Sequence, residues 1–360
     1  MKKEEKEMRK RANVFTALVL ATALVATGCG AGPDSEKTNK KTVSVPKNVE
    51  AVSERTVYVS PEWVYSLIEG DQPESDNYKI LECSWGTEED SPTYEKGHIP
   101  GAIHVNTDDI ESPEKWDFRS AKEIKNLVLK DGITKDTVVV CYGNDENIAA
   151  DDRVATALLW LGVENVKVMN QGLPGWEKKD FPVNTDKVKC KAVKDFGTKV
   201  PANPQFIIDT EGVKDKLAND ENFKLVSIRS RDEFEGRTSG YSYIDKAGEP
   251  EGAIWGHDTD DGSYCDKEGN IVGIETLNKY LEESGASTKN DLAFYCGTGW
   301  RAAIPFLICY EKGLDNMYLF DDGWFVWQMD PKNKVQVGDP AGSDCKITTV
   351  SELPKGKAKK

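Results

Sequence analysis

Short runs of apolar residues alternate along the chain with longer segments in which apolar positions recur every three or four residues. The short runs, such as Val138–Val140 and Leu292–Tyr295, predict buried strands, and the periodic segments, such as Asp151–Leu161 and Ala302–Tyr310, predict helices. Strands that alternate with helices of this length indicate a parallel sheet covered by helices on both faces. We therefore expect an α/β fold.

The order of these elements occurs twice. Residues 184–204, which contain Lys-rich stretches and two prolines, are the expected linker between two homologous domains at residues 56–183 and 205–337. Residues 338–360 are the expected C-terminal tail. Three positions mark the repeat, at offsets of 151, 155 and 151 residues: Gly101 recurs as Gly252, Cys141 as Cys296 and Gly172 as Gly323.

The composition fits a soluble globular protein of about two domains, with 360 residues, 38% of them hydrophobic, and a formal net charge of −15. Nucleic acid is not an expected partner, because phosphate binding requires clustered Lys and Arg, and the two predicted domains contain no such cluster. The run from His257 to Gly262 is acidic, but its spacing does not match an EF-hand loop. We interpret this run as a solvated loop and expect neither a metal site nor a cofactor.

The N-terminus resembles a bacterial lipoprotein signal peptide. Basic residues at positions 9–11 precede an apolar stretch, Val14–Ala26, which is followed by small residues and Cys29. This stretch is too short to span a bilayer, which requires roughly 20 residues, so an uncleaved membrane anchor is the less favoured alternative. We expect cleavage after residue 28, lipidation of Cys29, and an extracytoplasmic, membrane-anchored location in the cell envelope. Residues 29–55 are polar and aperiodic, which predicts a flexible tether.

The candidate chemistry lies in the stretch Leu292–Ala303, where a predicted strand, a glycine-rich turn and a predicted helix follow one another. The turn begins with Cys296. Backbone N–H groups in such a turn, together with the positive end of the helix dipole, stabilise a thiolate, which makes Cys296 the candidate nucleophile. The alternative, a buried structural cysteine, would not need two glycines and an arginine beside it. The predicted anion cradle consists of Gly297, Thr298, Gly299, Trp300 and Arg301.

Three motifs resemble those of the rhodanese sulfurtransferases. Cys296–Arg301 resembles the active-site loop of that family, Gly97–Ile103 its Gly-His-Ile-Pro-Gly-Ala motif, and Asp321–Trp327 its Gly-x-x-x-Trp motif. The resemblance covers nearly the whole mature chain and implies two tandem rhodanese-like domains. With the insertion Gly236–Lys246, the chain is similar to the periplasmic multi-rhodanese sulfurtransferases of bacteria. This implies an enzyme that moves sulfane sulfur from a donor such as thiosulfate to cyanide or a thiol, through a persulfide on Cys296.

The resemblance also implies that the first domain is non-catalytic, as the N-terminal copy in tandem rhodaneses usually is. Ser84 stands where the second domain has Arg229, and the loop after Cys141 is longer than the loop after Cys296. A reactive Cys141 stays open as the alternative. The longer loop also carries acidic residues, whose charges would oppose a bound anion: Asp145, Glu146, Asp151 and Asp152.

Other residues of the second domain are candidates for substrate binding. Arg229 would lie at the carboxyl edge of the sheet, where it could bind the sulfonate end of a donor, or else form a salt bridge between loops. Arg237, from the insertion, is a further candidate. His257 could act as a base for an acceptor thiol, or could be merely hydrogen-bonded. Cys190 and Cys345 lie just outside the predicted cores, so a disulfide between them is conceivable in an exported protein.

Two other functions stay open. Phosphatases and arsenate reductases share this fold and a loop with cysteine and arginine, but their loops place five residues between the two. Four residues separate Cys296 from Arg301, which favours sulfur over phosphate. The second alternative is a non-catalytic lipoprotein that uses the loop only to bind a sulfur compound or a partner.

Overall fold

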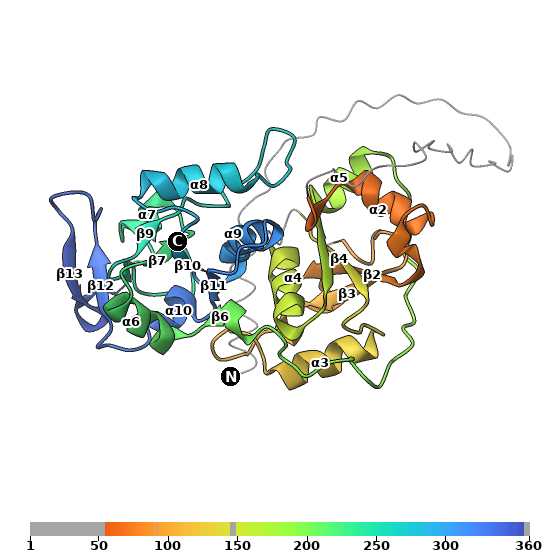
Figure 1. The fold of residues 1–360 in the computed structure, drawn as a ribbon, viewed down its shortest axis with the longest axis horizontal. Helices are drawn as coiled ribbons and strands as arrows, with labels where there is room; N and C mark the ends of the chain where they lie inside the picture. The colour runs from red at the N-terminus through yellow and green to blue at the C-terminus, as the bar shows by residue number, and fades with distance from the viewer. Residues whose placement is uncertain (1–54, 92, 145–148, 356–360) are drawn as a thin grey trace, which may run out of the picture. The chain divides into compact units, whose positions relative to one another are not determined.

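The computed structural model describes residues 55–91, 93–144 and 149–355, and places both predicted domains in one compact unit (Figure 1). The predicted signal peptide, Cys29 and the tether up to residue 54 lie outside the described residues. No helix in the described ranges is long and apolar enough to cross a membrane.

The first domain is a five-stranded parallel sheet with the strand order β1-β5-β4-β2-β3. Local signals set the helix starts, since the Ser60 side chain accepts from the Trp63 N–H at the start of α2, and Ser120 and Glu123 form a capping box at α3. The elements are β1 (Tyr58–Val59), α2 (Pro61–Ile68), β2 (Tyr78–Ser84), β3 (Ala102–Asn106), α3 (Ala121–Lys130), β4 (Val138–Tyr142), α4 (Ala150–Leu161), β5 (Asn165–Met169) and α5 (Gly172–Lys178).

The second domain contains a parallel sheet of the same topology, in the order β6-β11-β10-β7-β9, which confirms the predicted tandem repeat. Residues 185–203, within the predicted linker, form no helix or strand. The elements of this sheet and its helices are β6 (Ile207–Ile208), α6 (Thr210–Asn219), β7 (Phe223–Ser227), α7 (Arg231–Phe234), β9 (Ile254–Trp255), α8 (Ile274–Glu283), β10 (Asp291–Tyr295), α9 (Trp300–Glu311), β11 (Met317–Phe320) and α10 (Gly323–Trp327).

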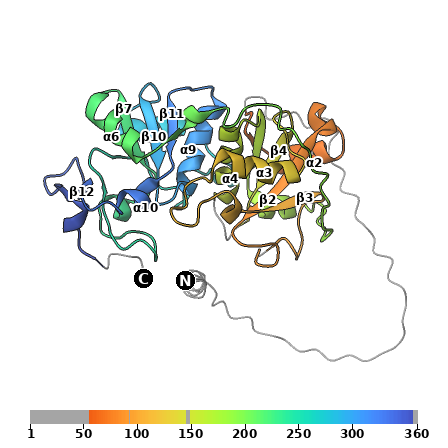
Figure 2. The ribbon, with the colours of Figure 1, turned by 90° about the horizontal axis from the view of Figure 1, so that it is seen from below.

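The two domains meet along α4 and α9, which lie side by side between the two sheets in both views (Figures 1 and 2). Apolar residues of both helices belong to one hydrophobic cluster that extends into both sheets, including Val154 and Leu158 of α4 and Ile304 and Ile308 of α9. These are the two helices that follow the loops of interest, so each domain contributes to the surroundings of the other domain's loop.

The prediction of a separate C-terminal tail from residue 338 is wrong. Residues after this point return as β13 (Lys346–Thr349), which pairs antiparallel with β12 (Lys334–Val337), and β12 also pairs with β8 (Glu249–Pro250). Val350 and Leu353 are buried in the core of the second domain. The segment looked like a tail because its apolar residues are few and its strand is short.

Candidate active site

Cys296 directly follows strand β10, and helix α9 begins four residues later. The thiol-bearing residue is almost entirely buried, with 1% of its surface exposed. The start of α10 fixes the loop, because the Trp324 N–H donates to the Cys296 carbonyl oxygen (2.9 Å) and the Phe325 N–H to the Gly297 carbonyl oxygen (3.0 Å). The first N–H groups of α9, which begins at Trp300, have no carbonyl partners within the helix, as at every helix start.

Two glycines of the loop are needed for space as well as for the turn. A Cβ on Gly297 would lie 2.3 Å from the Tyr241 ring, and a Cβ on Gly299 would lie 2.5 Å from Nη1 of Arg153. Gly299 also has a φ of +90°, in the region that favours glycine. The sequence predicted a tight loop, and the structure shows which side chains press against it.

Tyr241, from the insertion Gly236–Lys246, closes the loop from one side. Its hydroxyl oxygen accepts from the Gly297 N–H (2.9 Å) and from Nη2 of Arg301 (2.5 Å). Burial raises the pKa of Tyr241 well above its usual value, and Cys296 raises it further while Arg301 lowers it. The phenol therefore stays protonated and keeps its own proton to donate.

Arg301 is held by carboxylates. Its guanidinium donates to both oxygens of Glu233 (2.9 and 3.0 Å) and to Oδ1 of Asp258 (2.8 Å). Asp258 is 5% exposed, so the acidic run that we interpreted as a solvated loop instead contributes a buried ion pair. Arg301 thus fixes the loop to two other segments, and its predicted contact with a bound anion stays a prediction.

Glu233 bridges two buried arginines, Arg229 and Arg301. Burial alone would raise the pKa of Glu233, but the two arginines outweigh it and lower the pKa to about 2. Because this pKa lies below the ordinary value of 4.5, the carboxylate stabilises the fold fully above about pH 4.5 and loses this effect as the pH falls towards 2.

We expect Glu233→Gln to lower the free energy of unfolding by roughly 3 kcal/mol at pH 7, because it leaves two buried guanidinium groups short of a partner. Urea unfolding at pH 7 and pH 3 measures the effect, which should shrink at the lower pH. Glu221→Gln, at an exposed glutamate of the same domain, is the matched control and should change the free energy of unfolding little. An equal loss at both pH values would show that the charge of Glu233 is not what matters.

The first domain reaches the active-site loop through Glu111 and Arg153. The Trp300 Nε1–H donates to Oε1 of Glu111 (2.8 Å), which also accepts from Nε of Arg153 (2.9 Å). Nη1 of Arg153 lies 2.6 Å from Oδ1 of Asp321, which directly follows β11. Burial raises the pKa of Glu111 to about 7, although Arg153 and Trp300 lower it. Sequence reasoning missed this connection, because nothing local marks a residue that acts across a domain boundary.

An aromatic cluster from both domains surrounds this connection. Trp116 of the first domain stacks on Phe325 (ring centroids 4.8 Å apart) and meets Tyr243 edge-on (4.5 Å). Tyr243 contacts Tyr241, which itself contacts the loop, and is 40% exposed. The residues around Cys296 therefore come from both domains.

The interpretation of Cys141 as the counterpart of Cys296 is wrong. Cys141 lies inside β4 and pairs with Val168, and the matching pair in the second domain is Phe294 with Leu319. The Leu173 N–H donates to the Gly143 carbonyl oxygen, as the Trp324 N–H does to that of Cys296. Gly143 therefore occupies the position that Cys296 has in the second domain. The uneven offset of 155 residues, beside two offsets of 151, was the signal of this shift.

A carboxylate fills the space next to Gly143. A Cβ on this glycine would lie 3.1 Å from Oδ1 of Asp151. The backbone N–H groups of Asp151, Asp152 and Gly143 lower the pKa of the Asp151 carboxyl, but burial outweighs them and raises it to about 6. The first domain thus has no cysteine at this position, and its own aspartate occupies the cradle. Asp145 and Glu146 lie outside the described residues.

Arg229 does not reach a substrate site, which corrects the prediction. Its guanidinium is fully buried and donates to Oε1 of Glu249 (2.7 Å) and to the carbonyl oxygens of Gly248 and Ser239. The alternative of a salt bridge between loops is what the structure shows. The strand register does confirm that Ser84 occupies the same position in the first domain.

Arg237 and His257 have partners away from the loop. Arg237 is exposed and pairs with Asp232 and Glu235. His257 stacks between Trp255 and Tyr280, and its Nε2 lies 2.9 Å from Oε2 of Glu283. The structure thus gives the alternative of a hydrogen-bonded histidine, and no described contact joins either residue to Cys296.

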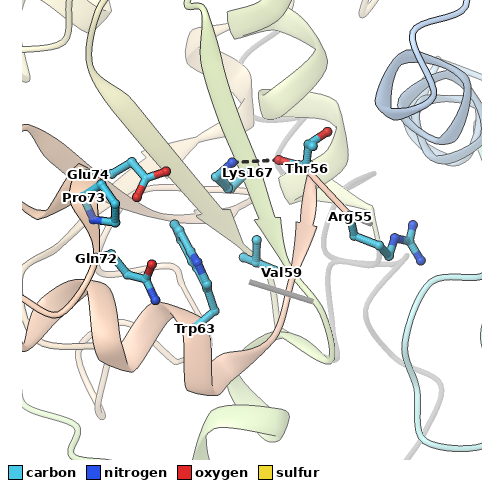
Figure 3. A pocket seen from close by; sticks show the side chains of 8 residues that line it. All are labelled: Arg55, Thr56, Val59, Trp63, Gln72, Pro73, Glu74 and Lys167. Carbon is cyan, nitrogen blue, oxygen red and sulfur yellow. Dashed lines mark hydrogen bonds between the residues drawn. The ribbon is translucent and has the colours of Figure 1, made fainter. Parts of the chain in front are cut away.

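The seven cysteines among the described residues are free, so Cys190 and Cys345 form no disulfide. In the same residues, no group of three or more His, Cys, Asp or Glu could hold a metal ion. A cavity of about 310 Å³ in the first domain contains Lys167, which donates to the Thr56 carbonyl oxygen (2.7 Å), but no cysteine lines it (Figure 3). Figure 3 therefore shows a feature separate from the active-site loop.

The sequence of each domain matches a known family of protein domains. The model of the rhodanese-like domain matches residues 60–179 and again residues 209–330. The chain belongs to the rhodanese family. Both family matches coincide with the two parallel sheets, so this rhodanese has two complete copies of the domain.

The relatives of this rhodanese are sulfurtransferases. It is 35% identical over 306 residues to the thiosulfate sulfurtransferase YnjE of Escherichia coli (strain K12), covering 82% of this chain and 69% of YnjE. It is 26% identical over 278 residues to a putative thiosulfate sulfurtransferase of Haloferax volcanii, covering 76% of this chain and 93% of that protein. The chain is accordingly a sulfurtransferase.

Solved structures of similar proteins have the same fold. The crystal structure of YnjE superimposes with a TM-score of 0.73 at 35% identity, covering 79% of this chain and 68% of YnjE. A persulfide form of an EanB variant with ergothioneine superimposes with a TM-score of 0.74 at 32% identity, covering 80% and 72% of the two chains. A further EanB structure, with hercynine, has a TM-score of 0.73 at 33% identity, covering 80% and 70%.

Proposed function

We propose that Cys296 carries the transferred sulfur as a persulfide, with thiosulfate as the donor and cyanide or a thiol as the acceptor. The Cys296 thiolate attacks the outer sulfur of thiosulfate, the sulfur–sulfur bond breaks, and sulfite leaves with the bonding electron pair. Cyanide then attacks the outer sulfur of the persulfide and leaves as thiocyanate, which regenerates the thiolate. This scheme requires ping-pong kinetics.

The observation that carries the proposal is the position of Cys296 between a buried strand end and the start of a twelve-residue helix. At such a position the N–H groups and the helix dipole favour a negative charge on sulfur. The names of the relatives support thiosulfate as the donor, and the persulfide form of an EanB variant supports the intermediate.

Loop length favours sulfur over phosphate. Arg301 is the fifth residue after Cys296, and Tyr241 and Arg153 press on the two glycines between them. A loop enclosed in this way has little space for a tetrahedral oxyanion. The phosphatase and arsenate reductase alternatives are therefore less favoured.

The experiment that tests the proposal is the intact mass of the protein after incubation with thiosulfate. We expect a gain of one sulfur atom, which cyanide removes. The same sample is tested for hydrolysis of a phosphate ester. An unchanged mass, or phosphate ester hydrolysis that depends on Cys296, would contradict the proposal. A persulfide that forms but that neither cyanide nor a thiol removes would support a binding role without turnover.

We further propose that the mature protein is anchored by lipid at Cys29, on the extracytoplasmic side of the cell envelope. The support is the sequence pattern before Cys29, since this region lies outside the described residues.

Cys29→Ala is expected to abolish labelling by a radioactive fatty acid and to release the protein from the membrane fraction, because lipidation requires the thiol. Cys190→Ala, at a cysteine between the two domains, is the matched control and should keep the label. Label retained by Cys29→Ala, or a mature N-terminus at another residue, would disprove the anchor.

A further inference from the structure

A cavity of about 500 Å³ lies beside Gly143 and Asp151, at the place in the first domain that corresponds to the loop after Cys296. Gly143, Asp151 and Asp152 line it from the first domain, and residues between Thr259 and Ile271 line it from the second. Its volume is that of a pocket for a small organic molecule. It also contacts Ile304 of α9, one turn after Arg301.

The position of this cavity would suit an anion, because the cavity lies at the start of α4 just as Cys296 lies at the start of α9. In the first domain, however, the Asp151 carboxyl lies in the first turn of α4, and its Oδ1 would be 3.1 Å from a Cβ on Gly143. The positive end of this helix is therefore neutralised from within. A second anion placed there would meet the charge of Asp151.

The other charged residues of the cavity also make it more favourable for a cation than for an anion. Asp152, Asp260 and Glu268 line it, against a single lysine, Lys178. Asp260 is partly engaged, because its carboxylate lies 3.8 Å from Arg301. Asp152 accepts from the Tyr58 hydroxyl (2.7 Å). Burial and the neighbouring Asp151 raise the pKa of the Asp152 carboxyl well above its ordinary value, so a cation bound beside it would stabilise its charged form.

A buried polar group in the wall is also without a partner. Thr259 is 6% exposed, and its hydroxyl has no hydrogen-bond partner among the residues that the structure describes. A buried hydroxyl without a partner is costly, so this group favours a ligand that forms a hydrogen bond with it, and its oxygen can accept from a donor. Apolar surface beside it comes from Met169, Ile271 and Ile304.

We propose that this cavity binds a small organic cation, with an ammonium or guanidinium group that donates to Asp152 and to the Thr259 hydroxyl, and an apolar body against Ile271 and Ile304. The site goes beyond sulfur transfer and does not involve Cys296. The described residues offer no metal-binding group, so an organic cation rather than a metal ion is the class that fits.

Calorimetric titration of the full chain with agmatine tests the proposal. We expect one saturable site with a Kd of about 1 mM or tighter, and no binding of uncharged butylurea or anionic glutarate. Asp152→Asn should weaken agmatine binding by about tenfold, and Glu268→Gln, on the exposed rim, should weaken it less. Lys178→Gln should instead strengthen it, because it removes the repelling charge.

Two controls make the result decisive. Glu177→Gln, beside Lys178 on α5 but not lining the cavity, should leave binding unchanged. Cys296→Ser should bind agmatine as the wild type does, so a failure of the sulfur-transfer proposal would not affect this one. Absence of saturable agmatine binding, or glutarate binding that Lys178→Gln weakens, would overturn the proposal. If Asp152→Asn unfolds, the opposite effects expected of Glu268→Gln and Lys178→Gln still decide it.

Discussion

Cys296→Ser is expected to abolish sulfur transfer from thiosulfate to cyanide and to prevent the gain of one sulfur atom. A serine hydroxyl stays protonated at neutral pH and cannot hold a persulfide, so both half-reactions lose their carrier. The fold should survive, because serine is close to cysteine in size and the loop is fixed by backbone hydrogen bonds from α10. Thiocyanate formation and intact mass measure the two effects.

The matched control is Cys141→Ser. Cys141 is fully buried inside β4, at the position of Phe294 rather than that of Cys296, so its replacement should leave most of the activity. Its cost should appear as a lower melting temperature, because it buries a hydroxyl in an apolar core. A loss of turnover in folded Cys141→Ser equal to that in Cys296→Ser would mean that the first domain carries or relays sulfur.

Arg301→Lys is expected to lower the turnover of thiosulfate by about tenfold or more, although it keeps the charge. The guanidinium joins the loop to Glu233, Asp258 and Tyr241 through four hydrogen bonds, and an ammonium cannot reproduce this planar arrangement. Loss of one charge-assisted hydrogen bond costs roughly 1.5–3 kcal/mol, which corresponds to at least a tenfold change in rate if it misplaces the nucleophile.

Arg237→Lys provides the comparison. This arginine was also a candidate for substrate binding, but it is exposed and pairs only with carboxylates on the surface. We expect the turnover of thiosulfate to change by less than about twofold, because exposed ion pairs contribute little to stability. Equal effects of the two substitutions on turnover would show that the buried network around Arg301 does not position the loop.

The position of Cys296 between a strand and a helix followed from local sequence. The apolar run Leu292–Tyr295, the glycines after Cys296 and the amphipathic segment that follows act within about a dozen residues, so their spacing predicts a strand, a loop and a helix. The same reasoning predicted both parallel sheets. Loop length and charge also indicated correctly that the two cradles differ.

The equivalence of Cys141 and Cys296 could not be decided in this way. Two cysteines near the ends of matching strands look alike in a sequence, but a shift of two residues along β4 separates a core position from the position after the strand. Strand register is set by pairing with neighbours distant in the chain, here Val168 and Leu319. The true counterpart, Gly143, carries no chemical signal of its own.

Short-range periodicity and motif spacing were enough to predict the two α/β domains, the family and the loop that begins with Cys296. Three features could be seen only in the folded chain: Arg229 is buried, Asp258 and Glu233 hold Arg301, and Glu111 and Arg153 reach the loop from the other domain. The physical reason is that ion pairs and hydrogen bonds depend on distances between side chains. Those distances are fixed by packing between segments far apart in the chain, in this case α4 against α9.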